Sequence, residues 1–256
     1  MANPQPRGGW VSSLFRSAYD LVLIVGFVIV IRTLVVAPFY VPSASMEPTL
    51  LIGDELLTTK YPFGYSRYSL PLDLGPALSG RLFGKLPERG DVVVFKLPRD
   101  SSETLVKRVI GLPGDRLQMR EGRLWINDQI VPIREAGVGE IEMDDGIKSV
   151  AARYIETLPN GREHTIIKLT NNGPLDDTPV YLVPPNHLFM MGDNRDNSLD
   201  SRVPEDHEGV GYVPAENLIG RVDLVLASWD FPIATRGPLW GWPSELRLSR
   251  FFSGVK

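Results

Sequence analysis

The sequence of 256 residues contains no cysteine and only three histidines, His164, His187 and His207. The absence of cysteine excludes disulfide bonds, a cysteine nucleophile and thiolate metal sites, and it is compatible with an oxidising compartment. The three histidines lack the spacing of a zinc-binding helix, so we expect no metal or other cofactor. The chain also lacks a basic surplus, with a formal net charge of −4 and a pI of about 5.5, which argues against a nucleic-acid partner.

Outside one N-terminal stretch, the chain also lacks a helical periodicity of three turns. Short runs rich in β-branched residues occur instead, separated by Gly-Asp, Pro-Gly-Asp and Glu-Gly turn signals. These runs predict strands at residues 91–95, 105–110, 123–127, 164–170, 180–183 and 222–228. The region from about 128 to 180 differs because it contains an acidic patch and several Gly and Asn turns. We interpret it as a β-rich insertion between core strands or as a set of exposed hairpins.

One long hydrophobic run is present near the N-terminus. The segment LVLIVGFVIVI at residues 21–31 is followed by Arg32, Thr33 and a second apolar run that ends before Pro38. Together these residues approach the ~20 that a helix needs to cross a bilayer. Arg32 would cost ~2.5–3.5 kcal/mol at the bilayer centre, so we place it near an interface, where its charge can reach water.

A cleavable signal peptide and an uncleaved anchor both explain parts of this segment. Arg7, Arg16 and the apolar run fit a signal peptide, with residues 43–45 as a small-x-small cleavage site. The anchor is favoured because apolar residues resume after Arg32, and the basic residues favour a cytoplasmic N-terminus. We therefore predict a cytoplasmic tail at residues 1–18, a transmembrane anchor at 19–38 and an extracytoplasmic domain at 39–256 that contains the insertion at about 128–180.

Two serines lie directly after the predicted anchor, in YVPSASMEPTLLIGD at residues 40–54. Ser43 and Ser45 lie between Pro42 and Pro48, which restrict the backbone. An ordinary exit loop is one interpretation, since Ser and Pro are frequent in turns. A nucleophile held rigidly beside a membrane is the other. A Ser/His/Asp triad using His187 or His207 is disfavoured because the chain has no GxSxG elbow.

A lysine in the run LVKRVI at residues 105–110 is a candidate base for such a serine. Strand alternation places Leu105, Lys107 and Val109 on one face. If this face is buried, loss of water disfavours the ammonium form and lowers the lysine pKa from its reference near ~10.4. A neutral amine can then take the proton from a serine hydroxyl without a histidine. The structural alternative is a lysine that protects a sheet edge or faces solvent.

A dense polar segment, MGDNRDNSLDSR, occupies residues 191–202. Neither possible register fits a calcium-binding EF-hand loop, because Arg195 or Ser201 falls where a ligand or glycine is required. The segment is therefore interpreted as a hydrogen-bonded loop that holds other groups in place, or as a structural polar turn. Asp200 and Arg202 stand at alternate positions and can pair, although a surface pair would contribute only ~0–1 kcal/mol.

Four segments, taken together and in this order behind an apolar N-terminal run, resemble a known family. They are PSASMEPTL at 42–50, RGDVVVF at 89–95, KRVIGLPGD at 107–115 and GDNRDNSLDSR at 192–202. They closely resemble the bacterial type I signal peptidases, membrane-bound serine proteases that use a Ser/Lys dyad. The resemblance extends from the anchor to about Ser228, but the segments 57–89 and 128–180 carry no motif that can be aligned.

The resemblance implies a role for individual residues. Ser45 matches the nucleophile and Lys107 the general base, while the Ser43 hydroxyl and the Ser45 backbone amide match the oxyanion hole. The residue that orients the lysine amine matches Ser198, and the supporting ion pair matches Asp200 and Arg202. Family positions with a structural role match Arg108, Gly192, Asp193 and Arg195. Positions that line the substrate pockets, and whose bulk implies small substrate side chains, match Phe39, Val41, Met46, Leu50 and Val106.

The resemblance also implies a fold, an activity and a location. The fold would be mainly β, with an antiparallel, barrel-like catalytic core, a β-rich insertion and one N-terminal transmembrane helix. The activity would be removal of signal peptides after an Ala-x-Ala motif, on the periplasmic side of a bacterial inner membrane. Expected partners are preprotein signal peptides bound as extended strands and membrane phospholipid, with the secretion translocon as a further candidate.

Two other classes of protein remain to be distinguished from this one. Self-cleaving repressors share a Ser/Lys dyad and a similar core fold, but they carry a DNA-binding domain where this chain has an apolar run. A non-catalytic, membrane-tethered β scaffold or binding module is the alternative from a different class. That alternative predicts that replacing Ser45 and Lys107 leaves the function intact.

Overall fold

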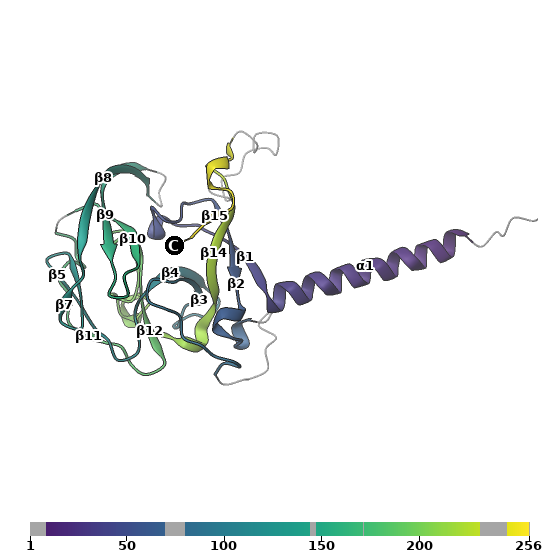
Figure 1. Cartoon of the computed structure of the whole chain (residues 1–256), viewed down its shortest axis with the longest axis horizontal. Helices are drawn as coiled ribbons and strands as arrows, with labels where there is room; N and C mark the ends of the chain where they lie inside the picture. The colour runs from purple at the N-terminus through teal and green to yellow at the C-terminus, as the bar shows by residue number, and fades with distance from the viewer. Residues whose placement is uncertain (1–8, 70–79, 144–146, 171, 231–244, 256) are drawn as a thin grey trace, which may run out of the picture.

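The computed structural model describes residues 9–69, 80–143, 147–170, 172–230 and 245–255. A single helix projects from a β-rich body (Figure 1). This helix, α1, spans Gly9–Leu34, and its part Ser13–Leu34 is long and apolar enough to cross a membrane. The described side chains of that span are not buried against the rest of the chain, as expected for a lipid-facing helix. Residues 1–8 of the predicted tail lie outside the described part, and its remainder belongs to α1.

The junction between α1 and the β-rich body is short. The helix ends at Leu34, and strand β1 begins two residues later and spans Val36–Tyr40. The Tyr65 hydroxyl donates a hydrogen bond to the Leu34 carbonyl over 2.6 Å. The Lys60 N–H donates to the Val35 carbonyl over 3.0 Å. The helix is therefore tied to the body at the point where it ends, and the last residues of the predicted anchor are part of a strand.

The largest sheet has eight strands. Its order is β1-β2-β14-β3-β4-β12-β13, with β15 paired to β14, and all pairs are antiparallel. Pro38 lies in β1, the first strand of this order, where its missing N–H is tolerated. The other strands are β2 (Asp54–Thr59), β3 (Val92–Lys96), β4 (Thr104–Gly111), β12 (His187–Met191), β13 (Val213–Pro214), β14 (Leu218–Ser228) and β15 (Ser253–Gly254).

Two smaller antiparallel sheets complete the body. One has the order β11-β5-β6-β7, and the other, here called the insertion sheet, has the order β10-β9-β8. The first contains β5 (Arg116–Arg120), β6 (Arg123–Ile126), β7 (Gln129–Ile130) and β11 (Tyr181–Leu182). The insertion sheet contains β8 (Ile133–Glu142), β9 (Lys148–Thr157) and β10 (Glu163–Lys168). The structure thus confirms a mainly β fold with one apolar N-terminal helix and a β-rich insertion.

The core lies on both faces of the central strands. Val93 of β3 and Val109 of β4 belong to one buried cluster, whereas Val92 and Val94 of β3 belong to another. Residues 92–95 of β3, VVVF, are all apolar because each face of their strand is covered. Strand β4, which contains Lys107, is therefore enclosed between two apolar layers.

Candidate active site

Ser45 lies on the connection between β1 and β2. Its residue belongs to a single 3-10 turn, Ala44–Met46. The Val41 N–H donates to the Asp54 carbonyl over 2.9 Å and the Gly53 N–H donates to the Val41 carbonyl over 3.0 Å, so the connection is closed at its base. Ser45 is only 9% exposed. The two adjacent strands therefore hold the serine in one place at the surface of the core.

Lys107 and Ser45 are in direct contact. The Lys107 amine Nζ donates a hydrogen bond to Ser45 Oγ over 2.5 Å, although the two residues are 62 positions apart. Lys107 is 3% exposed and lies across from Val93 in the β3–β4 ladder. Leu105 and Val109, its neighbours on the same face, pack in the same apolar cluster as Val93. The face that carries Lys107 is therefore buried, which removes the edge and solvent-facing interpretations of this lysine.

Ser43 and Ser198 lie on two sides of the contact. Ser43 Oγ is 3.2 Å from Ser45 Oγ. Ser198 is buried and lines the same cavity as Lys107, but its Oγ forms no hydrogen bond with any residue in the described ranges. A Cβ at Gly192 would lie 2.3 Å from Ser198 Oγ and 2.4 Å from the Ser45 carbonyl oxygen, so only glycine fits there. The orienting role of Ser198 stays a prediction.

Asp200 and Arg202 form a buried ion pair, not a superficial one. Arg202 donates two hydrogen bonds to the two Asp200 carboxylate oxygens, each over 2.8 Å. The same carboxylate accepts a bond from the Gly192 N–H over 3.0 Å, and Arg202 also donates to the Arg195 carbonyl over 2.7 Å. Burial alone would raise the pKa of Asp200, but the Arg202 guanidinium and the Gly192 N–H lower it below its usual value. The charged pair thus fixes the fold of the polar segment 192–202.

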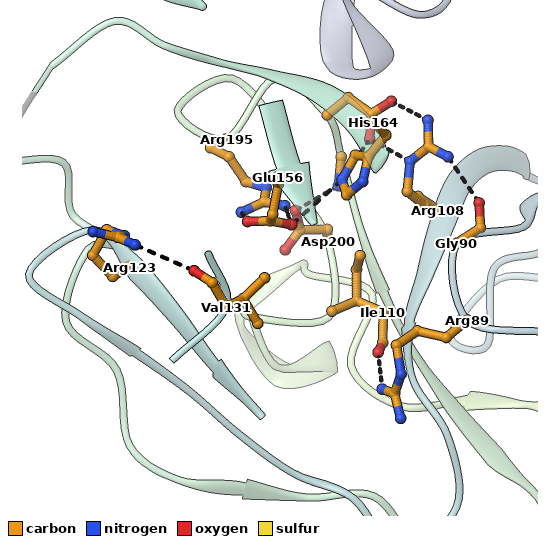
Figure 2. A network of polar contacts seen from close by, with 12 residues as sticks. Arg89, Gly90, Arg108, Ile110, Arg123, Val131, Glu156, His164, Arg195 and Asp200 are labelled. Atoms are coloured by element: carbon orange, nitrogen blue, oxygen red, sulfur yellow. Dashed lines mark hydrogen bonds and ion pairs between the residues drawn. The ribbon is translucent and has the colours of Figure 1, made fainter. Parts of the chain in front are cut away.

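Arg108 and Asp193 form a second buried pair, on the opposite face of β4 from Lys107. Arg108 donates to the Asp193 carboxylate over 2.8 Å and 2.7 Å, and to the Gly90 carbonyl over 2.8 Å. Thr49 Oγ1 donates to the same carboxylate over 2.5 Å. Burial opposes ionisation of Asp193, but the Arg108 charge and hydrogen bonds keep its pKa below the usual value. Figure 2 shows Arg108 reaching Gly90. The pair joins the polar segment to the strand that carries Lys107.

A cavity of about 580 Å³ opens beside the Lys107–Ser45 contact. Ser43 and Ser198 also line it. Its other walls include residues outside the sequence motifs, namely Leu97, Arg99, Glu103, Leu175 and Glu208. These residues come from separate strands and loops, so no spacing in the sequence indicates that they meet. Among the residues that the structure describes, no cluster of three or more His, Cys, Asp or Glu side chains has a geometry that would hold a metal ion.

The five predicted pocket residues come together on the other side of the serine loop. They pack in one apolar cluster with Val92 and Ile219; the five are Phe39, Val41, Met46, Leu50 and Val106. Phe39 and Val106 are partly exposed, whereas Val41, Met46 and Leu50 are at most 4% exposed. None of the five lines the cavity beside Lys107. Their contact with substrate stays a prediction.

Comparisons with known proteins identify the family of this chain. A family model described as signal peptidase, peptidase S26, matches residues 14–229. The chain belongs to the signal peptidase family, peptidase S26. The matched range contains all four motif segments as well as the insertion sheet, and it includes most of α1. This chain is therefore a peptidase of that family, and its apolar N-terminal helix is consistent with membrane anchoring.

Two relatives from Rickettsia species give the same result. The signal peptidase I of Rickettsia typhi is 41% identical over 244 residues, which cover 89% of this chain and 88% of the relative. The signal peptidase I of Rickettsia akari is 39% identical over 252 residues, with 93% and 91% covered. A crystal structure of a signal peptidase I from Enterococcus faecalis is 24% identical, with a TM-score of 0.30, and the match covers 54% of this chain and 97% of that one.

Proposed function

We propose that this chain is a membrane-anchored serine endopeptidase that removes signal peptides from exported preproteins, with Ser45 as nucleophile and Lys107 as general base. The observation that carries the proposal is the 2.5 Å contact between Lys107 Nζ and Ser45 Oγ within a largely buried site. A nucleophile within hydrogen-bond reach of its base is the arrangement that covalent catalysis requires. The relatives named signal peptidase I support the substrate class.

The surroundings of Lys107 favour its neutral form. Lys107 is buried and has the apolar residues Val93, Leu105 and Val109 as its neighbours in the β3–β4 ladder, and loss of hydration disfavours an ammonium group. The neutral amine takes the proton from Ser45 Oγ as this oxygen attacks the scissile carbonyl carbon. The resulting ammonium then donates that proton to the leaving amine, and a water molecule later releases the acyl group from Ser45 by the same route.

Ser43 supplies part of the oxyanion hole in this mechanism. Its hydroxyl lies 3.2 Å from Ser45 Oγ, so it is close to the position where the carbonyl oxygen of a bound peptide becomes negatively charged. The Ser45 backbone N–H is the second donor. Because the residues flanking the serines include Pro42 and Pro48, these donors are held in place before the substrate arrives.

The substrate binds as an extended strand beside the Ser45 loop. The residues expected to contact its side chains are bulky, and bulky pocket walls admit only small side chains, which is the basis for cleavage after Ala-x-Ala. Helix α1 crosses a bacterial inner membrane once, and Arg7 and Arg16 keep the N-terminus in the cytoplasm. The catalytic domain is then periplasmic. The hydrophobic segment of the signal peptide lies in the same bilayer, which raises its effective concentration.

A cleavage assay tests the proposal. The full chain in detergent micelles is incubated with a preprotein, and the N-terminus of the product is sequenced. Ser45→Ala and Lys107→Ala are expected to abolish cleavage, whereas the exposed residues Ser102 and Lys148 provide matched controls, Ser102→Ala and Lys148→Ala, that retain it. Cleavage by Ser45→Ala or Lys107→Ala at the parental rate would overturn the assignment of these two residues as nucleophile and base.

A further inference from the structure

The insertion sheet is hydrogen-bonded to the polar segment that follows β12. The Ile167 N–H of β10 donates to the Asp193 carbonyl over 3.0 Å, and the Arg195 N–H donates to the Ile167 carbonyl over 3.1 Å. These two bonds form a parallel bridge between Ile167 and Asn194. Residues 193–195 thereby extend the edge of the insertion sheet at β10, as one more short strand.

A second set of contacts lies one step further along both segments. The Asp196 carboxylate accepts hydrogen bonds from the N–H groups of Leu169 and Thr170 over 2.8 Å and 2.9 Å. Lys168 pairs with Asp176, and its Nζ is 3.5 Å from the Asp196 carboxylate. The end of β10 therefore holds the polar segment through backbone and side chain together.

A buried ion pair reinforces the same junction. Glu156 of β9 receives two hydrogen bonds from the Arg195 guanidinium, one of them over 2.8 Å, and both side chains are at most 2% exposed. Burial opposes ionisation of Glu156, but the Arg195 charge lowers its pKa below the usual value, so the pair stays charged. If either residue moved away, the other would be left as an unpaired buried charge. The two side chains are therefore held together.

His164 of β10 fills the space between the two buried ion pairs. Its Nε2 lies 3.4 Å from the Glu156 carboxylate and 3.9 Å from that of Asp193. Burial, followed by the positive charge of Arg108, lowers the pKa of His164 to about 4, so its ring is neutral at pH 7. Figure 2 shows the ring with Arg108 on one side and Glu156 and Arg195 on the other. The insertion sheet thus contributes a buried neutral imidazole, from His164, and one buried carboxylate, from Glu156, to this junction.

The polar segment in turn contacts the backbone of the proposed nucleophile. The Asn194 N–H donates to the Ser45 carbonyl over 3.2 Å, and the Asn194 side-chain amide donates to the Ala44 carbonyl over 3.2 Å. Asp193 pairs with Arg108, the residue next to Lys107 on β4. A continuous series of contacts therefore runs from β9 and β10 through residues 193–195 to both members of the Ser/Lys pair.

We propose that the insertion sheet positions the catalytic pair, with Glu156 holding Arg195 so that Asn194 fixes the backbone of Ser45. This inference rests on the proposed function and adds to it a task for the insertion. Glu156 acts through Arg195 and does not line the cavity, so it is a positioning residue. A displacement of about 1 Å at the reacting atoms can reduce a rate by about 10²-fold. If Glu156 positions the catalytic pair, its replacement should therefore lower kcat.

The test compares two glutamates of the same sheet in the full chain. Glu156→Gln removes the buried partner of Arg195, whereas Glu163→Gln removes the partner of Arg134 in an exposed pair, with side chains 61% and 50% exposed and 3.2 Å apart. We expect kcat for a signal-peptide substrate to fall about tenfold or more in Glu156→Gln with KM within about twofold, and Glu163→Gln to match the parent. Glu156→Asp, which keeps the charge, is expected to recover part of the lost kcat.

A double variant separates positioning from stability. Glu156→Leu with Arg195→Met replaces the ion pair by apolar groups, which is often neutral for stability, so the protein folds without the buried charge contact. Its kcat is expected to stay at least about tenfold low, at a temperature where circular dichroism shows it folded. Parental kcat in the folded double variant, or a change in KM alone, overturns the positioning role. The proposed function would still hold in that case if Ser45→Ala is inactive in the same assay.

Discussion

Lys107 and Arg108 are consecutive residues of β4, yet the strand directs them into opposite surroundings. Lys107 lines a cavity of about 580 Å³ and donates to a serine hydroxyl. Arg108 is 1% exposed and donates to a carboxylate and a carbonyl. In the proposed mechanism, one strand thus separates Lys107, which has to lose its proton, from Arg108, which keeps its charge. Burial disfavours the charge of a lysine, whereas an arginine remains charged and needs a paired carboxylate.

The largest effect on this comparison is expected from Lys107→Met, which keeps the length of the side chain and removes the amine. The rate kcat/KM should fall at least about 10⁴-fold, since a nucleophile without its base loses most of its reactivity. The folded state should lose less stability than after removal of Arg108, whose guanidinium gives the buried Asp193 carboxylate two hydrogen bonds. Single-turnover cleavage kinetics and thermal unfolding measure the two quantities. A large drop in stability with activity retained would contradict the assignment.

Arg108→Met tests the other side of the strand. Removal of the guanidinium leaves the Asp193 carboxylate buried without its partner, and breaking such a pair costs about 3–5 kcal/mol. We expect the free energy of unfolding to fall by that amount in a denaturant titration. Lys148→Met, at an exposed position of β9, is the control and should change stability by less than about 0.5 kcal/mol. Equal stability of the two variants would show that the Arg108 pair is not structural.

Ser43→Ala examines the cavity side without touching the base. Loss of one oxyanion donor should reduce kcat about 10²–10³-fold, equivalent to about 2.7–4 kcal/mol of barrier, with little change in KM or stability. Ser43→Thr retains the hydroxyl and should be closer to the parent. A rise in KM with unchanged kcat would instead indicate that Ser43 contributes to substrate binding alone.

The smallest effect is expected from Glu47→Gln. This variant contrasts two buried carboxyl groups, that of Glu47 and that of Asp193, which receives two hydrogen bonds from Arg108. Glu47 is 3% exposed; burial, together with the Glu142 charge, raises its pKa from 4.5 to about 7 despite a hydrogen bond from the Glu142 N–H. The folded protein therefore binds more protons than the unfolded chain between pH 4.5 and 7, so this group lowers stability as the pH rises through that window.

The variant should accordingly be more stable than the parent by about 2–3 kcal/mol at pH 8–9, and the difference should disappear near pH 4. Thermal unfolding of both proteins across this pH range measures the effect. A difference that does not depend on pH would mean that Glu47 is charged in the folded state throughout.

The sequence predicts the strands that contain a run rich in β-branched and other apolar residues. All six predicted runs, including 91–95 and 222–228, overlap strands of the structure. The two longest strands of the insertion sheet, β8 and β9, were not predicted individually. Much of β8 is exposed and its sequence, IREAGVGEIE, contains two glycines, so it carries neither an apolar run nor a regular alternation. Such strands exist because of the partners they pair with, and a single local window does not contain those partners.

The candidate site divides in the same way. Alternation along β4 places Lys107 on an apolar face, and the resemblance pairs it with Ser45, so the contact at the centre of the site was expected before the structure. The Glu156–Arg195 pair was not expected. It joins residues 39 positions apart, one of them in a segment without an alignable motif. The partner of Arg195 can be identified only from the structure, in which the parallel bridge between residues 167 and 194 brings the polar segment against the insertion sheet.

The short junction between α1 and β1 has a mechanical consequence. Only Val35 lies between the helix and the strand, and Tyr65 is hydrogen-bonded to the last helical residue. The short junction therefore restricts movement of the Ser45 loop relative to α1. In the proposed membrane-anchored state, the Ser45 loop would therefore lie at a fixed height above the lipid surface. The enzyme would then select scissile bonds by their distance from the lipid surface as well as by their sequence. A signal peptide with a shortened apolar stretch would place its cleavage site at a distance from the membrane that does not match that of Ser45.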